Sequence, residues 1–161
     1  MKSKVAVPIA IAGVLLIAAT IYILSKASVF DKSIYEINWR IDLPSDYKVI
    51  YQMQDDHGFR GDGNRYTILQ LTGDNSFPLR YEKYEETDDM QEVEGNSTDG
   101  NYSEIESFVD EIIAKLNIPQ EYRPVYFNRY SWQKFVKHKS DILVILYFLE
   151  LKRMYFIEKL I

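Results

Sequence analysis

The sequence contains no cysteine and little glycine, proline or histidine, with 7 Gly, 5 Pro and 2 His in 161 residues. The absence of cysteine excludes disulfide bonds, thiolate nucleophiles, cysteine-ligated zinc and a lipidated cysteine behind an N-terminal apolar segment. Stability must therefore come from buried apolar surface. Apolar residues make up 47% of the chain and aromatic residues 14%. That content is far above the range of disordered chains, so we expect one folded domain.

Familiar catalytic motifs are lacking as well. The two histidines, His57 and His138, lie in no H-E-x-x-H or related spacing, and the chain contains no P-loop and no G-x-S-x-G pattern. The sequence therefore offers no specific support for an enzyme.

The charges are unevenly distributed along the chain, although their sum is only −5. Residues 74–118 contain 13 acidic and 3 basic side chains, whereas residues 119–161 contain 4 acidic and 8 basic ones. Nucleic-acid binding needs clustered Lys and Arg, and the only basic region here is also one of the most apolar and aromatic. We expect no nucleic-acid partner.

An uncharged apolar run of 20 residues, from Val5 to Leu24, begins close to the N-terminus. As a helix it would reach about 30 Å, the thickness of the hydrocarbon core of a bilayer. A cleaved signal peptide is the alternative, since residues 25–27 (Ser-Lys-Ala) fit a small-x-small cleavage site. Signal peptides usually have apolar regions of about 7 to 15 residues, so the length favours an uncleaved anchor.

The basic residues around this run predict its orientation. Lys2 and Lys4 precede the run, and the positive-inside bias, together with a tail of only four residues, favours a cytoplasmic N-terminus. We predict two parts: a tail and transmembrane signal anchor over residues 1–27, and a domain over residues 28–161 outside the cytoplasm. The protein would then be a single-pass protein of the plasma membrane, with residues 5–24 contacting lipid.

Three segments near the start of the domain show the two-residue period of half-buried strands. Apolar and polar side chains alternate over residues 35–43, and over residues 47–53 with one exception at Ile50. Residues 65–72 are rich in β-branched and apolar side chains. We predict a three-stranded meander.

The middle of the chain predicts a loop and then a helix. Residues 74–101 are acidic and rich in turn-forming residues, which is typical of a long loop. Ser103 and Glu106 have the spacing of a capping box. The apolar residues after Ser103 recur at three- and four-residue intervals: Ile105, Phe108, Val109, Ile112, Ile113 and Leu116. We predict an amphipathic helix over residues 103–116.

The last third returns to strands, over residues 130–137, 142–149 and 154–160, with short polar turns between them. The second of these is almost entirely apolar and too short to cross a membrane, so it belongs in the middle of a sheet. The predicted fold class is α+β: after the transmembrane helix, an antiparallel sheet of about six strands in the order βββ-α-βββ with one packed amphipathic helix.

Ionisable residues and glycines gather between the second and third predicted strands. Asp55, Asp56, His57 and Asp62 could coordinate a divalent cation, and the backbone N–H groups could hold a ligand phosphate. Glycines are equally what a tight β connection needs, because they adopt positive φ without penalty. The sequence favours the plain turn, and this candidate cation is the only cofactor it indicates.

Several features of the chain together resemble small membrane-anchored or exported proteins of Bacillus-like Gram-positive bacteria. These features are the anchor followed by a small domain, the pattern D-x-H-G-F-x-G-D-G over residues 55–63, and the closing pattern from Trp132 through residues 141–147 to 154–158. The resemblance covers most of the domain and implies a location but no activity.

A tethered sheet with an acidic and a basic region has surfaces for binding but no legible reaction centre. We therefore expect a non-catalytic binding or accessory module of the cell envelope, whose partner is another envelope protein or a wall component. The alternative is a metal- or ligand-binding sensor or hydrolase that uses the connection over residues 55–62.

Overall fold

The computed structural model describes residues 32–55, 62–73, 80–81, 90–98, 102–138 and 140–161. The chain divides into two compact units, Met1–Phe30 and Asp31–Ile161, and the described residues all belong to the second. The predicted anchor over residues 5–24 lies outside them. Within the described ranges, no helix has the length and hydropathy needed to cross a bilayer.

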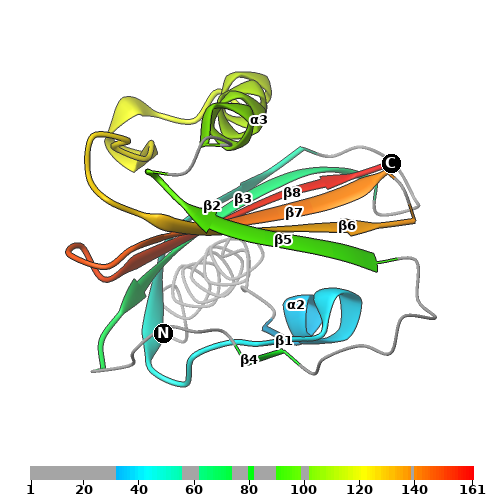
Figure 1. The fold of residues 1–161 in the computed structure, drawn as a ribbon, viewed down its shortest axis with the longest axis horizontal. Coiled ribbons are helices and arrows are strands. Elements are labelled where there is room, and N and C mark those ends of the chain that lie inside the picture. Colours follow the sequence, from blue (N-terminus) through cyan, green and yellow to red (C-terminus); the bar gives the residue numbers. More distant parts are fainter. Residues whose placement is uncertain (1–31, 56–61, 74–79, 82–89, 99–101, 139) are drawn as a thin grey trace, which may run out of the picture. The chain divides into compact units, whose positions relative to one another are not determined.

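A six-stranded antiparallel sheet forms the centre of the domain, which confirms the predicted α+β class (Figure 1). The strand order is β2-β3-β8-β7-β6-β5. The strands are β2 (Tyr47–Gln54), β3 (Gly63–Leu71), β5 (Met90–Asn96), β6 (Ser131–Lys137), β7 (Asp141–Phe148) and β8 (Arg153–Leu160). The predicted strands over residues 47–53, 65–72, 130–137, 142–149 and 154–160 are therefore confirmed.

The predicted strand over residues 35–43 is wrong. Residues Lys32–Trp39 form helix α2, and only Ile41–Asp42 form a short strand, β1. Tyr35 and Trp39 are buried because a four-residue spacing places them on one face of a helix, while Ile37 is 71% exposed. Arg40, at φ 51°, ends the helix in the left-handed conformation.

The predicted loop over residues 74–101 is wrong in part, because it contains two strands. Residues Arg80–Tyr81 form β4, which pairs with β1 in a separate two-stranded sheet, and β5 is the sixth strand of the main sheet. β5 pairs only with β6, so it is an edge strand with exposed Glu92 and Glu94. Charges are common on edge strands because they oppose pairing with other chains. Residues 74–79, 82–89 and 99–101 lie outside the described ranges.

A β-bulge explains why Ile50 breaks the alternation of its strand. The β2–β3 register shifts between Val49 and Tyr51, so Ile50 has no partner across the strands. Ile50 and Tyr51 both pack against the hydrophobic core. Because the bulge adds one residue, side chains after it point to the opposite face of the sheet from the one that simple alternation predicts. The second half of β2 therefore no longer follows the predicted pattern.

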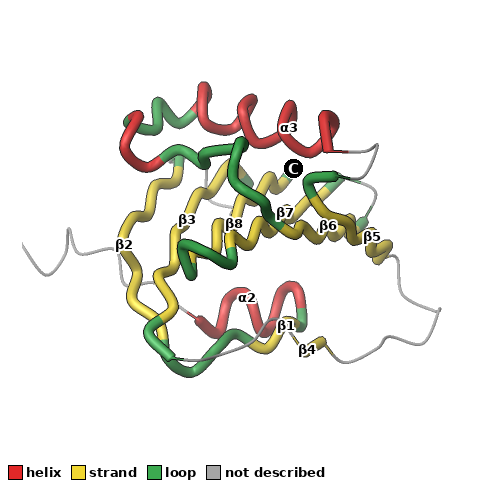
Figure 2. The backbone as a smooth tube through the Cα atoms, turned by 60° about the vertical axis from the view of Figure 1, so that its left-hand side comes forward, coloured by secondary structure: helices red, strands yellow, loops and turns green. Residues whose placement is uncertain are grey.

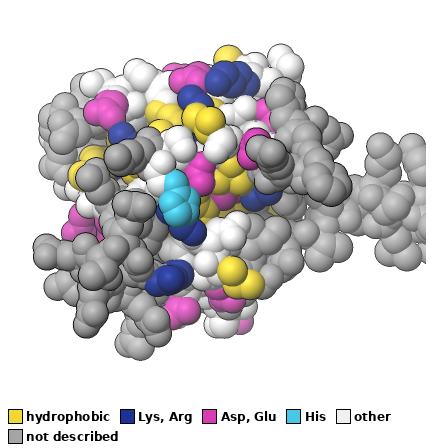
Figure 3. Space-filling model, turned by 90° about the vertical axis from the view of Figure 1, so that its right-hand side faces the viewer, with side chains coloured by type: hydrophobic (Ala, Val, Ile, Leu, Met, Phe, Trp, Pro, Cys, Tyr) yellow, Lys and Arg dark blue, Asp and Glu magenta, His cyan; other side chains and the backbone are white. Residues whose placement is uncertain are grey.

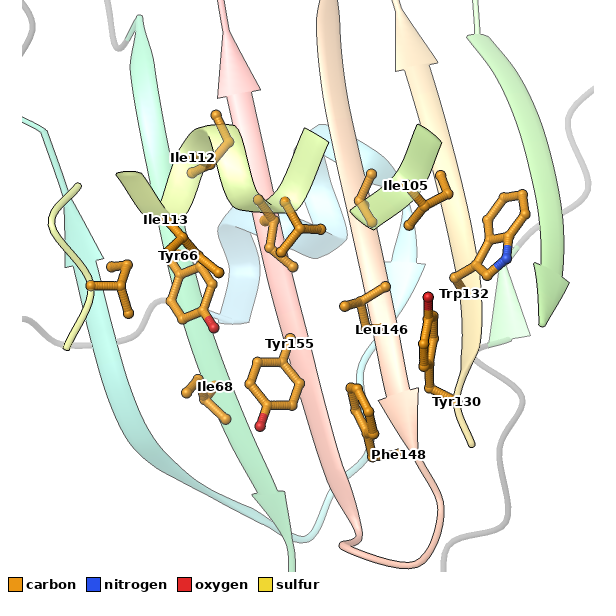
Figure 4. Close-up of a cluster of buried hydrophobic side chains, with 14 of the residues drawn as sticks. Tyr66, Ile68, Ile105, Ile112, Ile113, Tyr130, Trp132, Leu146, Phe148 and Tyr155 are labelled. Carbon is orange, nitrogen blue, oxygen red and sulfur yellow. The ribbon is translucent and has the colours of Figure 1, made fainter. Parts of the chain in front are cut away.

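The predicted amphipathic helix is confirmed as α3, Tyr102–Lys115. Its buried face packs on one side of the sheet in a cluster drawn in Figure 4, which includes Ile105, Ile112, Ile113, Tyr66, Trp132, Leu146 and Tyr155. Phe108 lies at the margin of that cluster and is only partly buried. The predicted capping box is not found, because α3 begins one residue before Ser103 and Glu106 instead accepts a hydrogen bond from the Tyr130 hydroxyl at 2.8 Å.

The two helices α2 and α3 lie on opposite faces of the main sheet (Figure 2). On the α2 side, the Tyr35 ring packs against Phe156 of β8 with centroids 5.1 Å apart. Both faces of β8 are thus covered, which its nearly continuous apolar sequence requires.

We expect Ile112→Ala to lower the free energy of unfolding by about 3 kcal/mol, because it opens a cavity under α3 at a fully buried side chain. The matched control is Ile37→Ala, the same chemical change at an exposed site, which should cost under about 0.5 kcal/mol. Denaturant unfolding of both variants measures the difference. Equal costs would mean that α3 does not pack on the sheet.

Buried tyrosines make the stability of the domain sensitive to alkaline pH. Burial raises the pKa of Tyr35, Tyr66 and Tyr126, and the charge of Asp110 raises the pKa of Tyr126 further. In the unfolded chain these hydroxyls ionise near pH 10, roughly, whereas the folded chain keeps them protonated. The unfolded state then binds fewer protons, so the free energy of unfolding falls as the pH rises above about 10.

Thermal melts of the full chain should therefore give a level melting temperature at neutral and mildly alkaline pH and a decline above about pH 10. Tyr126→Phe should make that decline shallower, because one of the shifted groups is removed. A melting temperature that held level through the ionisation range would contradict the burial of these hydroxyls.

Candidate functional site

The first candidate is the connection between β2 and β3, of which the structure describes Asp55 and Asp62. The Asp55 carboxylate accepts two hydrogen bonds from Asn64, one from its backbone N–H to Oδ1 and one from its side-chain amide to Oδ2, each at 2.5 Å. The Asp55 backbone N–H also donates to the Asn64 carbonyl at 3.1 Å. Both carboxylate oxygens are therefore engaged in closing the β connection.

Gly63 is required at this connection by its conformation and its surroundings. Its φ of 136° is one that other residues rarely adopt, and a Cβ added there would collide with the Asp55 carboxylate. The Asp62 side chain is exposed to solvent. Among the described residues, no three His, Cys, Asp or Glu side chains are placed to hold a metal ion. Asp56 and His57 lie outside the described ranges, so the predicted cation site stays a prediction.

The second candidate is a buried charged cluster between α2 and the sheet, which the sequence analysis missed. The Glu158 side chain is 0% exposed, and its Oε1 accepts a hydrogen bond from Trp39 Nε1 at 2.6 Å. Its Oε2 pairs with Arg65 Nη1 at 3.0 Å. Glu158 and Arg65 lie directly opposite each other on β8 and β3. Each carboxylate oxygen thus has its own donor.

A second polar contact lies beside this cluster on the same helix. The Tyr35 hydroxyl lies 3.4 Å from Thr67 Oγ1. Burial raises the pKa of Tyr35, and the Glu158 charge adds to the rise. A carboxylate that is fully buried and has a donor for each oxygen contacts no solvent, so the cluster serves to hold α2 on the sheet.

We expect Arg65→Met to lower the free energy of unfolding by about 3 kcal/mol, because it leaves the Glu158 charge buried without its cation. The matched control is Lys115→Met, which removes an exposed i,i+4 pair with Glu111 and should cost under about 1 kcal/mol. Denaturant unfolding measures both. A similar cost for the two variants would show that Glu158 does not depend on Arg65.

The third candidate lies at one end of the sheet and begins with the segment that joins α3 to β6. This segment contains the short 3-10 helix η1, Gln120–Tyr122. The Tyr122 ring stacks on Tyr51 with centroids 4.1 Å apart, and its carbonyl accepts a hydrogen bond from the Tyr66 hydroxyl at 2.7 Å. Arg123 Nε donates to the Ile118 carbonyl at 2.8 Å. The first half of the segment is therefore firmly attached to the core.

The second half forms a turn that directs Phe127 into solvent. Asn128 N–H donates to the Val125 carbonyl at 3.0 Å, which closes a four-residue turn. Within it, the Tyr126 hydroxyl donates to Asp110 of α3 at 3.0 Å, and its ring lies 6.0 Å from that of Tyr130. Because Tyr126 is attached to the body of the domain, its neighbour Phe127 is held outward and is 90% exposed.

A pocket of about 300 Å³ lies beside this turn. Its lining comes from the end of β5, the start of β6 and the end of β7: Asn96, Ser97, Thr98, Arg129, Tyr130, Ser131, Tyr147 and Leu149. Arg129 is exposed, and within the described part of the chain its guanidinium forms neither a hydrogen bond nor an ion pair. The pocket therefore combines one available cation with hydroxyl, amide and apolar groups.

The turn between β7 and β8 adds further apolar surface at the same end. Leu149 is 65% exposed and Leu151 is 36% exposed. The turn is closed by a hydrogen bond from Lys152 N–H to the Leu149 carbonyl at 3.1 Å. Gln70 Nε2 also donates a hydrogen bond to the Leu151 carbonyl at 2.9 Å. We call the surface formed by Phe127, Arg129, Leu149 and Leu151 the loop end. Figure 3 shows the opposite end, where hydrophobic, basic and acidic side chains are mixed around a histidine.

No protein-family model, curated protein or solved structure matches this chain. The site must therefore be judged on its own chemistry. An arginine, hydroxyls and an amide around an apolar pocket can bind an anionic or hydroxyl-bearing ligand, and the exposed aromatic and aliphatic side chains beside it can bury apolar surface.

Proposed function

We propose that this protein is a membrane-anchored, non-catalytic binding module of the cell envelope, held at the plasma membrane by residues 5–24 with its domain outside the cytoplasm. The loop end is its binding surface. The apolar run and the flanking lysines support the anchor and its orientation, and the shape of the loop end supports the binding role.

The exposure of Phe127 is the observation that carries this proposal. Single exposed apolar residues are common on protein surfaces. This ring, however, stands on a turn in which the preceding residue, Tyr126, is bonded to α3, and the segment before the turn is bonded to the core through Tyr122. A turn whose backbone is already held loses little backbone entropy when a partner covers it. Exposed Leu149 and the pocket extend the surface on the same end of the sheet.

The composition of the pocket supports binding rather than catalysis. Its lining offers hydroxyl and amide groups and one guanidinium, and the carboxylates and imidazoles that usually act as general acids and bases are not among these residues. Such groups orient a ligand by hydrogen bonds without moving protons to or from it.

The lack of native cysteine permits a direct test by single-cysteine labelling. We expect the F127C variant to react several-fold more slowly with a membrane-impermeant maleimide in native membranes than in detergent, because its partner covers the site only in the membrane. The matched control is I37C, at a 71% exposed position on α2, which should react at the same rate in both. Both variants should react on intact cells.

Equal rates for F127C in membranes and in detergent would contradict the binding role of the loop end. A failure of both variants to react until the cells are permeabilised would contradict the proposed location. The melting temperature of each variant, compared with that of the unmodified chain, verifies that the fold is intact.

A further inference from the structure

We infer that the partner of the loop end is the phospholipid bilayer itself: Phe127 and Leu149 enter the membrane interface while Arg129 binds a lipid phosphate at the pocket. This inference rests on the proposed function and names the partner of the same surface. Four observations lead to it: the direction of α2, the length of the tether, the charge of the loops and the chemistry of the exposed side chains.

The direction of α2 places the start of the domain toward the loop end. Tyr35, in the first half of α2, contacts Phe156, whereas Trp39 at its end contacts Glu158. The helix therefore runs in the same direction as β8, which begins at Arg153 directly after the Leu149–Lys152 turn. At the far end of the sheet, Lys137 Nζ donates to the Asn38 carbonyl at 3.2 Å. The N-terminus of α2 consequently faces the end that carries Leu149 and Leu151.

The tether between the membrane and α2 is short. Only residues 25–31 separate the apolar run from Lys32, where α2 begins. Seven extended residues reach at most about 25 Å. In the anchored chain that we propose, this tether holds the domain near the bilayer, so the membrane is present at a high effective concentration whatever other partners the envelope contains.

The charge of the two loops is opposite to that of the chain as a whole. Residues 119–130 and 149–153 contain four basic and two acidic residues, in a protein of net charge −5. The basic residues are Arg123, Arg129, Lys152 and Arg153. Loops with a net positive charge and exposed apolar side chains match the phosphate and acyl layers of a phospholipid interface.

The side chains of the loop end also suit these layers individually. Phe127 and Leu149 project from two separate turns, so both can enter the interface without unfolding either loop. Arg129 presents a planar guanidinium, whose paired donors fit phosphate oxygens. The pocket beside it offers the Ser131 hydroxyl, and its volume of about 300 Å³ is in the range that accepts a small polar group.

Fluorescence quenching in protein-free vesicles tests this inference on the full chain. The F127W variant is reconstituted in vesicles of phosphatidylcholine and phosphatidylglycerol, with or without bromine on the acyl chains. The matched control is I161W, at a 69% exposed position on the opposite end of the sheet. Trp39 and Trp132 are buried and give the same background in both. We expect the brominated lipid to quench F127W several-fold more strongly than I161W.

Adding Arg129→Gln to F127W should lower the ratio of docked to undocked domains, measured by quenching, by about fivefold in anionic vesicles. The reason is that one basic contact with the lipid surface is lost. The shift should be smaller in vesicles of phosphatidylcholine alone. An unchanged ratio in anionic vesicles would overturn the assignment of Arg129 to a lipid phosphate.

Flotation of the vesicles in alkaline carbonate distinguishes a failure of the membrane anchor from a failure of the lipid-docking inference. A chain that leaves the vesicles overturns the anchor and the inference together, because the short tether is then lost. A chain that stays, with equal quenching at the two positions, overturns the inference alone. Protection of F127C in native membranes combined with an unquenched F127W in vesicles would assign the loop end to an envelope protein instead.

Discussion

The structure of this domain depends on burying strand β8 on both faces. β8 lies between β3 and β7 in the middle of the sheet, and five consecutive residues of it, from Met154 to Glu158, are buried. A strand of this kind needs a cover on each side. Helix α3 packs on one side, and α2 brings Tyr35 and Trp39 against the other. The β3–β8 pairing also joins the N-terminal hairpin to the C-terminal strands.

Glu158 is the one charged residue within this buried run, and it determines where α2 lies. Taking a carboxylate out of water is costly unless each oxygen has a partner. Arg65 supplies one partner from the neighbouring strand and Trp39 the other from α2. A purely apolar contact would let the helix slide along the sheet, whereas these two bonds fix its position and direction. The direction of α2 in turn places the start of the domain toward the loop end.

Tyrosine hydroxyls have a similar role on the other side of the sheet. Tyr66, Tyr126 and Tyr130 each bury a ring in or against the core and use the hydroxyl to hold a loop or α3. The segment between α3 and β6, in which η1 is the one described helix, is thereby held in place. A rigid loop can present an apolar side chain such as Phe127 at a small entropic cost on binding, which is why the loop end is suited to an interface.

The sequence alone determined the elements whose patterns are strong and local. The apolar stripe from Ile105 to Leu116 predicted a helix with one buried face, and the apolar run over residues 142–149 predicted a central strand. The tight connection at Gly63 follows equally from local chemistry. With the other strand-like segments, these patterns predicted the α+β class and five of the six strands of the main sheet.

Tertiary structure decided the elements whose patterns are short or ambiguous. Tyr35, Ile37 and Trp39 alternate like a strand, but Tyr35 and Trp39 also share a helix face, and only the Glu158 and Phe156 contacts select the helix. β5 is polar enough to resemble a loop, and pairing with β6 makes it a strand. The loop end could not be predicted, because the exposure of Phe127 depends on hydrogen bonds to residues distant in the chain, which no local pattern encodes.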